Sequence, residues 1–363
     1  MALGLYFHIP FCMRKCPYCD FYSLSFSEEM QEAYTSSTIR NIKSFSKQNV
    51  DTIYFGGGTP SLISAKNYGR IFSAINESFN LISPEISLEA NPGTVDFDKL
   101  KALREVGFNR ISFGVQSLKD DELLALGRVH TSAQAVEAIT LAKKAGFDNI
   151  SADIMLGLIG QDKISLSETL DRLLSLFVSH ISAYMLKIEN NTPYNRPEIL
   201  TQLPDDEKTA ELYLFTAEKL EKSGLFQYEI SNFSKPDFEC RHNLKYWHCE
   251  EYIGIGPSAH SYFNNKRYYS PPSLEEFISL DKQREIVTED NPRSFEEAAM
   301  LALRLSEGLS KKLCDEFDID FVLITKKAFP LINAGLIEIS DEKITLTKQG
   351  FLVSNSVIFK LIN

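Results

Sequence analysis

Tyr6-Phe7-His8-Ile9-Pro10-Phe11-Cys12-Met13-Arg14-Lys15-Cys16-Pro17-Tyr18-Cys19 is the stretch that decides how the rest of the chain is interpreted. Its C-x3-C-x2-C array places three of the six cysteines within eight residues. A disulfide framework is a poor interpretation, because so short a loop leaves the third thiol unpaired. Thiolates packed this closely are more typical of metal ligands. The stretch therefore predicts a metal centre bound through sulfur.

Two kinds of metal centre fit three clustered cysteines. A structural zinc site needs four closed ligands, and the fourth would have to come from His8 or from a distant residue. An iron–sulfur cluster is held by cysteine thiolates, and three thiolates on a four-iron cluster leave one iron open. An open iron can bind a small molecule, as the open position of a zinc site binds water. We favour the iron–sulfur interpretation.

The array follows a predicted strand at residues 3–9, and Tyr18 stands directly before its last cysteine. In both respects it resembles the radical S-adenosylmethionine (SAM) superfamily. The resemblance implies that Cys12, Cys16 and Cys19 hold a [4Fe-4S] cluster whose open iron chelates the amino and carboxylate groups of SAM. It also implies an electron donor, because an electron from the cluster cleaves SAM to a 5′-deoxyadenosyl radical.

Length and composition describe an ordinary globular protein. The chain has 363 residues, 44% hydrophobic and 24% charged, enough for one large domain or a large and a small one. Its formal net charge of −11 argues against a nucleic-acid footprint and against anionic membrane surfaces. No apolar run is long enough for a membrane span. Six cysteines without a secretory signal predict a cytoplasmic protein.

Buried-strand patterns recur along the first half of the chain, separated by helical patterns. Residues 107–112 and 146–151 are near copies, each with a glycine cap, a loop and a strand. Alternation of this kind predicts a parallel sheet. Together with the resemblance, the count predicts an α/β fold, a partial (β/α)6 TIM-like radical SAM barrel. The six predicted strands lie near residues 3–9, 50–56, 85–90, 110–115, 150–157 and 180–188.

Polar groups and glycines stand at the ends of these strands. Gly56-Gly57-Gly58-Thr59-Pro60 directly follows the second strand, and bare glycine backbone lets a ligand approach closely. The C-terminal ends of parallel barrel strands face the active site, so Glu89 and Asp153 suit an ammonium group or ribose hydroxyls. The resemblance implies that the SAM site consists of Tyr6, Gly57, Gly58, Thr59, Glu89, Gln116, Arg128 and Asp153.

A second informative stretch spans residues 240–262. It holds the only tryptophan, three of the six histidines and two further cysteines. A lone histidine here would more often be a structural hydrogen-bonding group. Its grouping with tryptophan and tyrosine favours a flat aromatic ligand, held by stacking and a possible axial donor. Gly254 and Gly256 lack the strand-turn-helix context of a dinucleotide site.

The tail has a different character. Helical patterns at 294–306 and 321–334, followed by a hairpin at 335–347, predict a small winged-helix-like domain. From Ser310 onward seven Lys/Arg balance seven Asp/Glu, which disfavours DNA binding and favours a cap or docking domain. We therefore expect a radical SAM core at 1–235, a connecting segment at 236–290 and this domain at 291–363.

Motifs along the whole chain resemble the coproporphyrinogen dehydrogenase group, which includes the oxygen-independent dehydrogenase and the HemW-type haem chaperones. The dehydrogenase has a fourth cysteine where this chain has Phe21, and a long extension before its cluster, whereas here the first ligand is Cys12. Residues 242–247, His-Asn-Leu-Lys-Tyr-Trp, match the H-N-x-x-Y-W motif of the HemW type. Ser258 departs from the glycine expected in its G-x-G-x-G-A-H-S segment.

The HemW-type resemblance implies haem as cargo, carried to an acceptor protein and bound by His242, Asn243, Tyr246 and Trp247. Two alternatives stay open, namely oxidative decarboxylation of coproporphyrinogen III in porphyrin metabolism and modification of another substrate by radical SAM chemistry. Because chaperone and dehydrogenase share one cofactor site, the sequence leaves open whether this chain is an enzyme.

Overall fold

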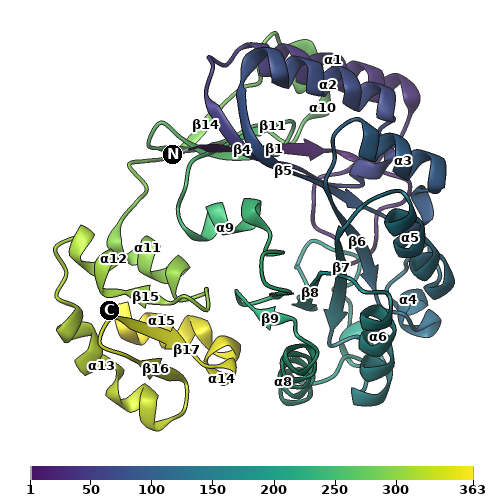
Figure 1. The fold of residues 1–363 in the computed structure, drawn as a ribbon. Coiled ribbons are helices and arrows are strands. Elements are labelled where there is room, and N and C mark those ends of the chain that lie inside the picture. The colour runs from purple at the N-terminus through teal and green to yellow at the C-terminus, as the bar shows by residue number, and fades with distance from the viewer. Residues whose placement is uncertain (1, 363) are drawn as a thin grey trace.

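Six parallel strands form the centre of the fold in the computed structural model, which describes residues 2–362 (Figure 1). They lie side by side in chain order and do not close into a complete barrel. This confirms the predicted partial (β/α)6 barrel. The six are β1 (Leu3–Ile9), β4 (Asn49–Gly57), β5 (Asn80–Ala90), β6 (Arg110–Gln116), β7 (Asn149–Leu156) and β8 (His180–Met185).

The strands are apolar on one face and polar on the other. In β6, Ile111 and Phe113 are buried in the hydrophobic core, whereas Arg110 and Ser112 alternate with them and line a cavity. Parallel strands covered on both faces are usually continuous apolar runs. The alternation seen here therefore indicates that the concave face of the sheet surrounds a polar site.

Helices cover the outer, apolar face. Ser27 caps the first of them by accepting a hydrogen bond from the Met30 amide at 3.2 Å, and Asp205 caps the last by accepting from the Lys208 amide at 2.8 Å. The helices are α1 (Glu28–Lys43), α2 (Ala65–Ser78), α3 (Phe97–Glu105), α4 (Asp120–Ala125), α5 (Ser132–Lys144), α6 (Lys163–Ser175) and α8 (Asp206–Lys222). Three short helical segments, η1 (Pro60–Leu62), η2 (Pro92–Thr94) and α7 (Pro197–Leu200), precede α2, α3 and α8 in the chain.

Segment 236–290 extends the sheet beyond β1, which the sequence did not predict. The added strands are β11 (Tyr252–Ile255), parallel to β1, and then the antiparallel β12 (His260–Phe263), β13 (Lys266–Tyr269) and β14 (Ile286–Asp290). At the other edge, β10 (Asn232–Ser234) and β9 (Phe226–Gln227) continue from β8. The result is a sheet of twelve strands. The division of the chain at 235 and 290 stays a prediction.

Helix α9 (Arg241–Trp247) carries the His-Asn-x-x-Tyr-Trp stretch and packs against β4. Figure 1 shows it on the concave side of the sheet, opposite α1, α2 and α10 (Leu274–Ser279). The motif therefore faces the polar side of the barrel strands.

The C-terminal body, residues 295–362, contains helices and a small sheet. The predicted hairpin is confirmed as β16 (Ile337–Ile339) and β17 (Lys343–Leu346), and β15 (Leu309–Ser310) adds a third strand. Lys348 forms an ion pair with Glu221 of α8, which joins this body to the barrel. Its helices are α11 (Phe295–Ala302), α12 (Lys311–Glu316), α13 (Phe321–Asn333), α14 (Lys348–Leu352) and α15 (Ser354–Ile362).

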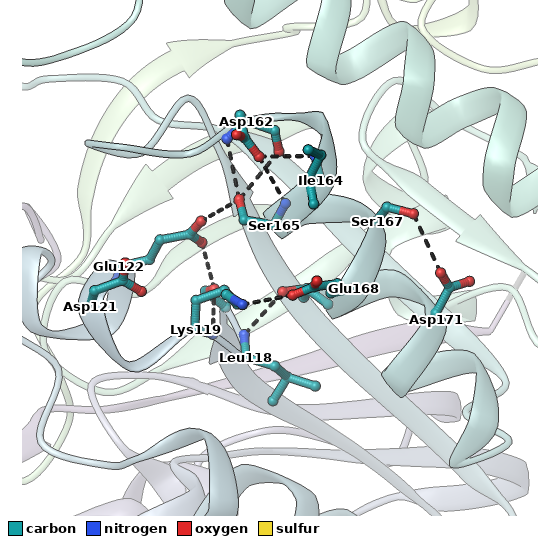
Figure 2. A network of polar contacts seen from close by, with 12 residues as sticks. Leu118, Lys119, Asp121, Glu122, Asp162, Ile164, Ser165, Ser167, Glu168 and Asp171 are labelled. Atoms are coloured by element: carbon teal, nitrogen blue, oxygen red, sulfur yellow. Dashed lines mark hydrogen bonds and ion pairs between the residues drawn. The ribbon is translucent and has the colours of Figure 1, made fainter.

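A polar network braces the loop after β6 (Figure 2). The buried carboxylate of Glu122 in α4 accepts hydrogen bonds from Ser117 at 2.6 Å and from Ser165 of α6 at 2.7 Å. Lys119 pairs with Glu168 at 2.6 Å across the same gap. Arg128 lies three residues after the end of α4, so this network fixes the segment that brings Arg128 to the cavity.

Candidate cofactor site

The concave face of the sheet encloses a cavity of about 610 Å³, here called the barrel cavity. Most residues predicted for the cluster and the SAM site line it. They are Cys12, Cys16, Cys19, Gly57, Gly58, Thr59, Glu89, Gln116, Arg128 and Asp153, joined by Asn243 from the predicted haem set. Tyr6, His242, Tyr246 and Trp247 are not among the lining residues.

The three cysteines lie in the loop between β1 and α1, where β2 (Phe11–Cys12) pairs with β3 (Leu24–Ser25). All three thiols are free, and two sulfurs accept hydrogen bonds. The Thr59 hydroxyl donates to Cys12 Sγ at 3.5 Å, and Arg128 Nη1 donates to Cys16 Sγ at 3.4 Å. Donors of this kind interact favourably with sulfur ligands of a metal centre.

Across residues 2–362, no three His, Cys, Asp or Glu side chains stand close enough to share a single metal ion. The suitability of the cysteines for an iron–sulfur cluster rests on their donor chemistry. Three unpaired sulfurs face one cavity, with a guanidinium and a hydroxyl directed at two of them. This donor set suits the thiolate ligands of an iron–sulfur cluster.

Glycine is required at Gly57 and Gly58 by the packing of the protein itself. Gly57 has φ of 107°, and a Cβ there would lie 2.7 Å from the His8 ring. A Cβ on Gly58 would lie 2.6 Å from the Phe11 carbonyl oxygen. The end of β4 is thus pressed against the start of the cysteine loop, which brings Thr59 to Cys12.

Two carboxylates project into the barrel cavity with raised pKa values. Burial raises the pKa of Glu89 to about 7, although the Tyr54 hydroxyl donates to Oε1 at 2.8 Å and the Gly57 amide donates to Oε2 at 3.1 Å. Burial also raises the pKa of Asp153, which accepts from Ser112 at 2.9 Å. A cation entering the cavity would favour the ionised form of both.

Arg128 spans the cavity wall between the cysteine loop and β6. It donates to Gly114 O at 2.9 Å and to the Tyr18 hydroxyl at 3.4 Å, and its Nε has no hydrogen-bond partner among the described residues. Gln116 lies at a register shift between β6 and β7 and has φ of 66°, which is unusual for a residue other than glycine. Backbone strain of this kind occurs at functional sites.

His242 is held from three sides. Its Nδ1 lies 2.9 Å from the Thr52 hydroxyl and its Nε2 lies 2.7 Å from the Tyr246 hydroxyl. The buried ring stacks on Tyr54 at 5.3 Å, and burial lowers its pKa to about 3. Ligation of haem iron by His242, which the motif predicts, requires one of these hydrogen bonds to open.

The other motif residues differ in their surroundings. Asn243 reaches the barrel cavity, whereas the Tyr246 ring meets the edges of His242 and Tyr252. Trp247, at the end of α9, is partly buried. The haem role of the four residues stays a prediction.

Comparisons with known proteins agree with this architecture. Residues 6–173 match the radical SAM superfamily, and residues 292–353 match the HemN C-terminal domain. A Lactococcus lactis protein named heme chaperone HemW is 35% identical over 365 residues, covering 98% of this chain and 96% of that protein. The chain belongs to the HemW family. The Escherichia coli HemW is also 35% identical, covering 96% and 91% of the two chains.

The chain also resembles a protein of an animal and an enzyme of known structure. A Danio rerio protein named radical S-adenosyl methionine domain-containing protein 1, mitochondrial, is 33% identical and covers 85% of this chain and 74% of its own. The Escherichia coli coproporphyrinogen III oxidase HemN superposes with a TM-score of 0.82 over 99% of this chain and 90% of its own, at 22% identity. This likeness confirms the fold class and the small C-terminal domain.

Several cavity residues of this HemW family member were missed by sequence reasoning. Tyr54, Arg110 and His180 line the barrel cavity. None of the three stands at the C-terminal end of a strand or belongs to a family motif named above. The alternation of polar and apolar residues within the strands could have identified them, because period-two polarity marks the inward face. Among the described residues, no helix is long and apolar enough to cross a membrane.

Proposed function

We propose that this chain is a haem chaperone that binds haem and passes it to an acceptor protein. The observation that carries the proposal is similarity over nearly the whole chain to proteins named heme chaperone HemW, at 35% identity in Lactococcus lactis and Escherichia coli. Phe21 supports it, because the position of the dehydrogenase's fourth cysteine holds a side chain without a sulfur ligand.

We propose that Cys12, Cys16 and Cys19 hold a [4Fe-4S] cluster and that SAM occupies the cavity beside it. When bound, the cluster supplies an electron and an open iron. Thr59 and Arg128 donate to the sulfurs of Cys12 and Cys16 and so orient these two ligands. Glu89 and Asp153 provide carboxylates for the cationic and hydroxyl groups of SAM. Tyr6 acts from behind this wall, since its hydroxyl contacts His8 Nδ1 at 3.1 Å and its ring stacks on Tyr54.

We propose that haem binds at the α9 stretch through His242, Asn243, Tyr246 and Trp247. The support is the match of residues 242–247 to the H-N-x-x-Y-W motif and the position of α9 on the concave side of the sheet. Release of the His242–Tyr246 hydrogen bond would free Nε2 for iron while Thr52 keeps Nδ1, and hydrogen bonding at the far nitrogen orients a metal-ligating imidazole.

The cellular setting follows from the same chemistry. Six free thiols and a reducible cluster suit a reducing compartment, and we propose the cytoplasm. An electron donor for the cluster and a haem acceptor are the required partners. The role lies in porphyrin metabolism as delivery of its end product.

A transfer assay tests this proposal. Cluster-reconstituted, haem-loaded protein is mixed anaerobically with excess apomyoglobin, and haem capture is followed in the Soret band with and without SAM and dithionite. We expect SAM plus reductant to change the transfer rate, and a Cys19→Ser variant to lose that response. In parallel, the protein receives coproporphyrinogen III, SAM and dithionite. Formation of protoporphyrinogen would replace the chaperone proposal with the dehydrogenase alternative.

A further inference from the structure

Arg110 is a buried cation, and two of its side-chain nitrogens make no hydrogen bond. It is the first residue of β6, its side chain is only 2% exposed, and it lines the barrel cavity. Its Nε and Nη2 atoms make no hydrogen bond, and the described part of the chain offers it no ion-pair partner. Leaving charged donors unsatisfied in the interior is costly, so the position calls for an acceptor.

The acceptors around Arg110 are already engaged with other donors. Glu85 accepts from the His242 amide at 3.3 Å and lies 3.8 Å from the Cys240 thiol. Glu89 accepts from Tyr54 and from a backbone amide, and Asp153 accepts from Ser112. These carboxylates therefore balance the charge of the cavity without satisfying the Arg110 donors.

The imidazole beside Arg110 is engaged in the same way. His180 Nδ1 lies 2.7 Å from the Ser151 hydroxyl, and its Nε2 lies 2.8 Å from the Tyr228 hydroxyl. Burial, and then the charge of Arg110, lower the His180 pKa well below its usual value. His180 is thus neutral and has no free nitrogen for Arg110.

Arg110 and Arg128 mark two levels of the barrel cavity. Arg128 donates to the carbonyl of Gly114, near the C-terminal end of β6. Arg110 begins the strand four residues earlier, and a parallel strand rises about 3.3 Å per residue, so its Cα lies about 13 Å below. The cysteine loop follows the C-terminal end of β1, so it lies at the upper level. His180, the first residue of β8, and Asn243 of α9 line the same cavity as Arg110.

The two unsatisfied atoms have a specific geometry. Nε–H and Nη2–H lie on the same edge of the planar guanidinium and form a fork of parallel donors. Such a fork matches the two oxygens of a carboxylate, which it binds bidentately. A monatomic anion would use the fork less completely. The arrangement of the free donors therefore indicates a carboxylate rather than a neutral ligand.

We propose that the lower level of the barrel cavity binds a second ligand through a carboxylate held on Arg110. The inference rests on the proposed function in one respect, since SAM is taken to occupy the upper level at Arg128. The ligand class is a small organic carboxylate, or a larger molecule that extends one carboxylate past SAM to the cavity floor.

Arginine side-chain NMR tests this site directly, with sodium propionate as the probe. The cluster-reconstituted protein is labelled with ¹⁵N-arginine, kept anaerobic with the cluster oxidised and saturated with SAM. Propionate is then titrated against propionamide and sodium chloride at constant ionic strength, while the Nε–H resonances are followed. The Arg110→Lys variant assigns the Arg110 resonance. Arg104 is the internal control, because its Nε already donates to Gly146 O at 3.0 Å.

We expect a saturable shift of the Arg110 resonance with propionate, none with propionamide and none at Arg104. We also expect propionate affinity to fall about tenfold or more in the Arg110→Lys variant, measured calorimetrically, because an ammonium offers no planar fork. Equal shifts with propionamide or chloride, or no saturable shift with propionate, would overturn the proposal. If Arg110→Lys does not fold, Arg110→Gln assigns the resonance instead, and the probes are then compared on the wild type.

The proposed position of SAM is tested by a separate resonance. Addition of SAM before propionate should shift the Nε resonance of Arg128, which has no partner in this structure. An Arg128 resonance that does not shift when SAM is added would count only against SAM binding at the upper level. The response of Arg110 to propionate would still decide the lower site.

Discussion

The Tyr54 hydroxyl donates a hydrogen bond to Oε1 of Glu89 at 2.8 Å. The Tyr54 ring also stacks on the His242 ring, with a centroid distance of 5.3 Å and an interplanar angle of 21°. One side chain therefore connects the predicted SAM carboxylate with the His-Asn-x-x-Tyr-Trp helix. A change in the position of α9 should therefore alter the surroundings of Glu89, and a change at Glu89 should alter the packing of α9.

Removal of the Tyr54 hydroxyl should raise the Glu89 pKa further, because this hydrogen bond favours the ionised carboxylate. In Tyr54→Phe we expect SAM binding near pH 7 to weaken several-fold, with the gap to wild type narrowing as pH rises toward 9. Isothermal titration with SAM across that range measures it. A gap that is constant with pH would show that Tyr54 does not tune Glu89.

The Glu89 carboxyl should also make stability depend on pH. Its folded pKa of about 7 lies above the ordinary value of 4.5, so its contribution is fully present below about pH 4.5 and is lost as pH rises through about 7. Ionisation should cost up to about 3 kcal/mol. Glu89→Gln should therefore show a smaller loss of unfolding free energy between pH 5 and pH 8 in urea titrations. Glu229, whose pKa is also raised by burial to about 7, remains in both proteins and cancels in the comparison.

The contact from Thr59 to Cys12 predicts an effect on the cluster. Hydrogen bonds to cluster sulfurs help set reduction potentials. We expect Thr59→Val to lower the reduction potential of the reconstituted cluster, since the variant keeps the size of threonine but loses the donor to Cys12 Sγ. An EPR-monitored redox titration measures the change, with Thr94→Val as a hydroxyl deletion away from the sulfurs. An unchanged potential in Thr59→Val would remove the proposed role of this contact.

His242 should be important for stability as well as for haem. His242→Ala leaves the Thr52 and Tyr246 hydroxyls without their partner and opens space in the interior, so the free energy of unfolding should fall by about 2–4 kcal/mol. His260 provides a matched control, because it is exposed, and His260→Ala should change stability by less than about 0.5 kcal/mol. Equal losses in the two variants, measured by urea denaturation, would contradict the network described here.

Ser258 occupies a position that the family motif assigns to glycine, and its φ of 67° explains that preference. A side chain in this left-handed region costs roughly 1 kcal/mol. Ser258→Gly should therefore raise the free energy of unfolding by up to about 1 kcal/mol. Asn264→Gly, at φ of 51°, should gain less, because asparagine tolerates this conformation better than serine. A destabilised Ser258→Gly would mean that the serine hydroxyl makes a compensating contact.

Much of the barrel could be predicted because its sequence signals are local. Buried-strand patterns and the glycine caps of residues 107–112 and 146–151 depend on neighbouring residues, and they predict the six central strands with helices between them. Strands β11 to β14 were missed because each has four or five residues and depends on pairing with β1 or with each other. Such short segments form strands only in the context of the sheet.

The candidate site shows the same division. The spacing of Cys12, Cys16 and Cys19 is enough to identify them as ligands in the sequence. The predicted strand ends likewise place Glu89 and Asp153 at the cavity. Arg110 could not be recognised in the same way, because only the three-dimensional structure shows that no neighbouring acceptor bonds to its Nε and Nη2 atoms. The inward burial of His242 is likewise a tertiary property, set by Thr52 and Tyr54 nearly two hundred positions earlier in the sequence.

An anaerobic haem titration of the cluster-reconstituted protein tests the central claim most directly, read in the Soret band beside His242→Ala and His260→Ala. We predict saturable one-to-one binding that weakens in His242→Ala and is unchanged in His260→Ala, with both variants checked for native fold by circular dichroism. Absence of saturable haem binding by the wild type would contradict the chaperone assignment.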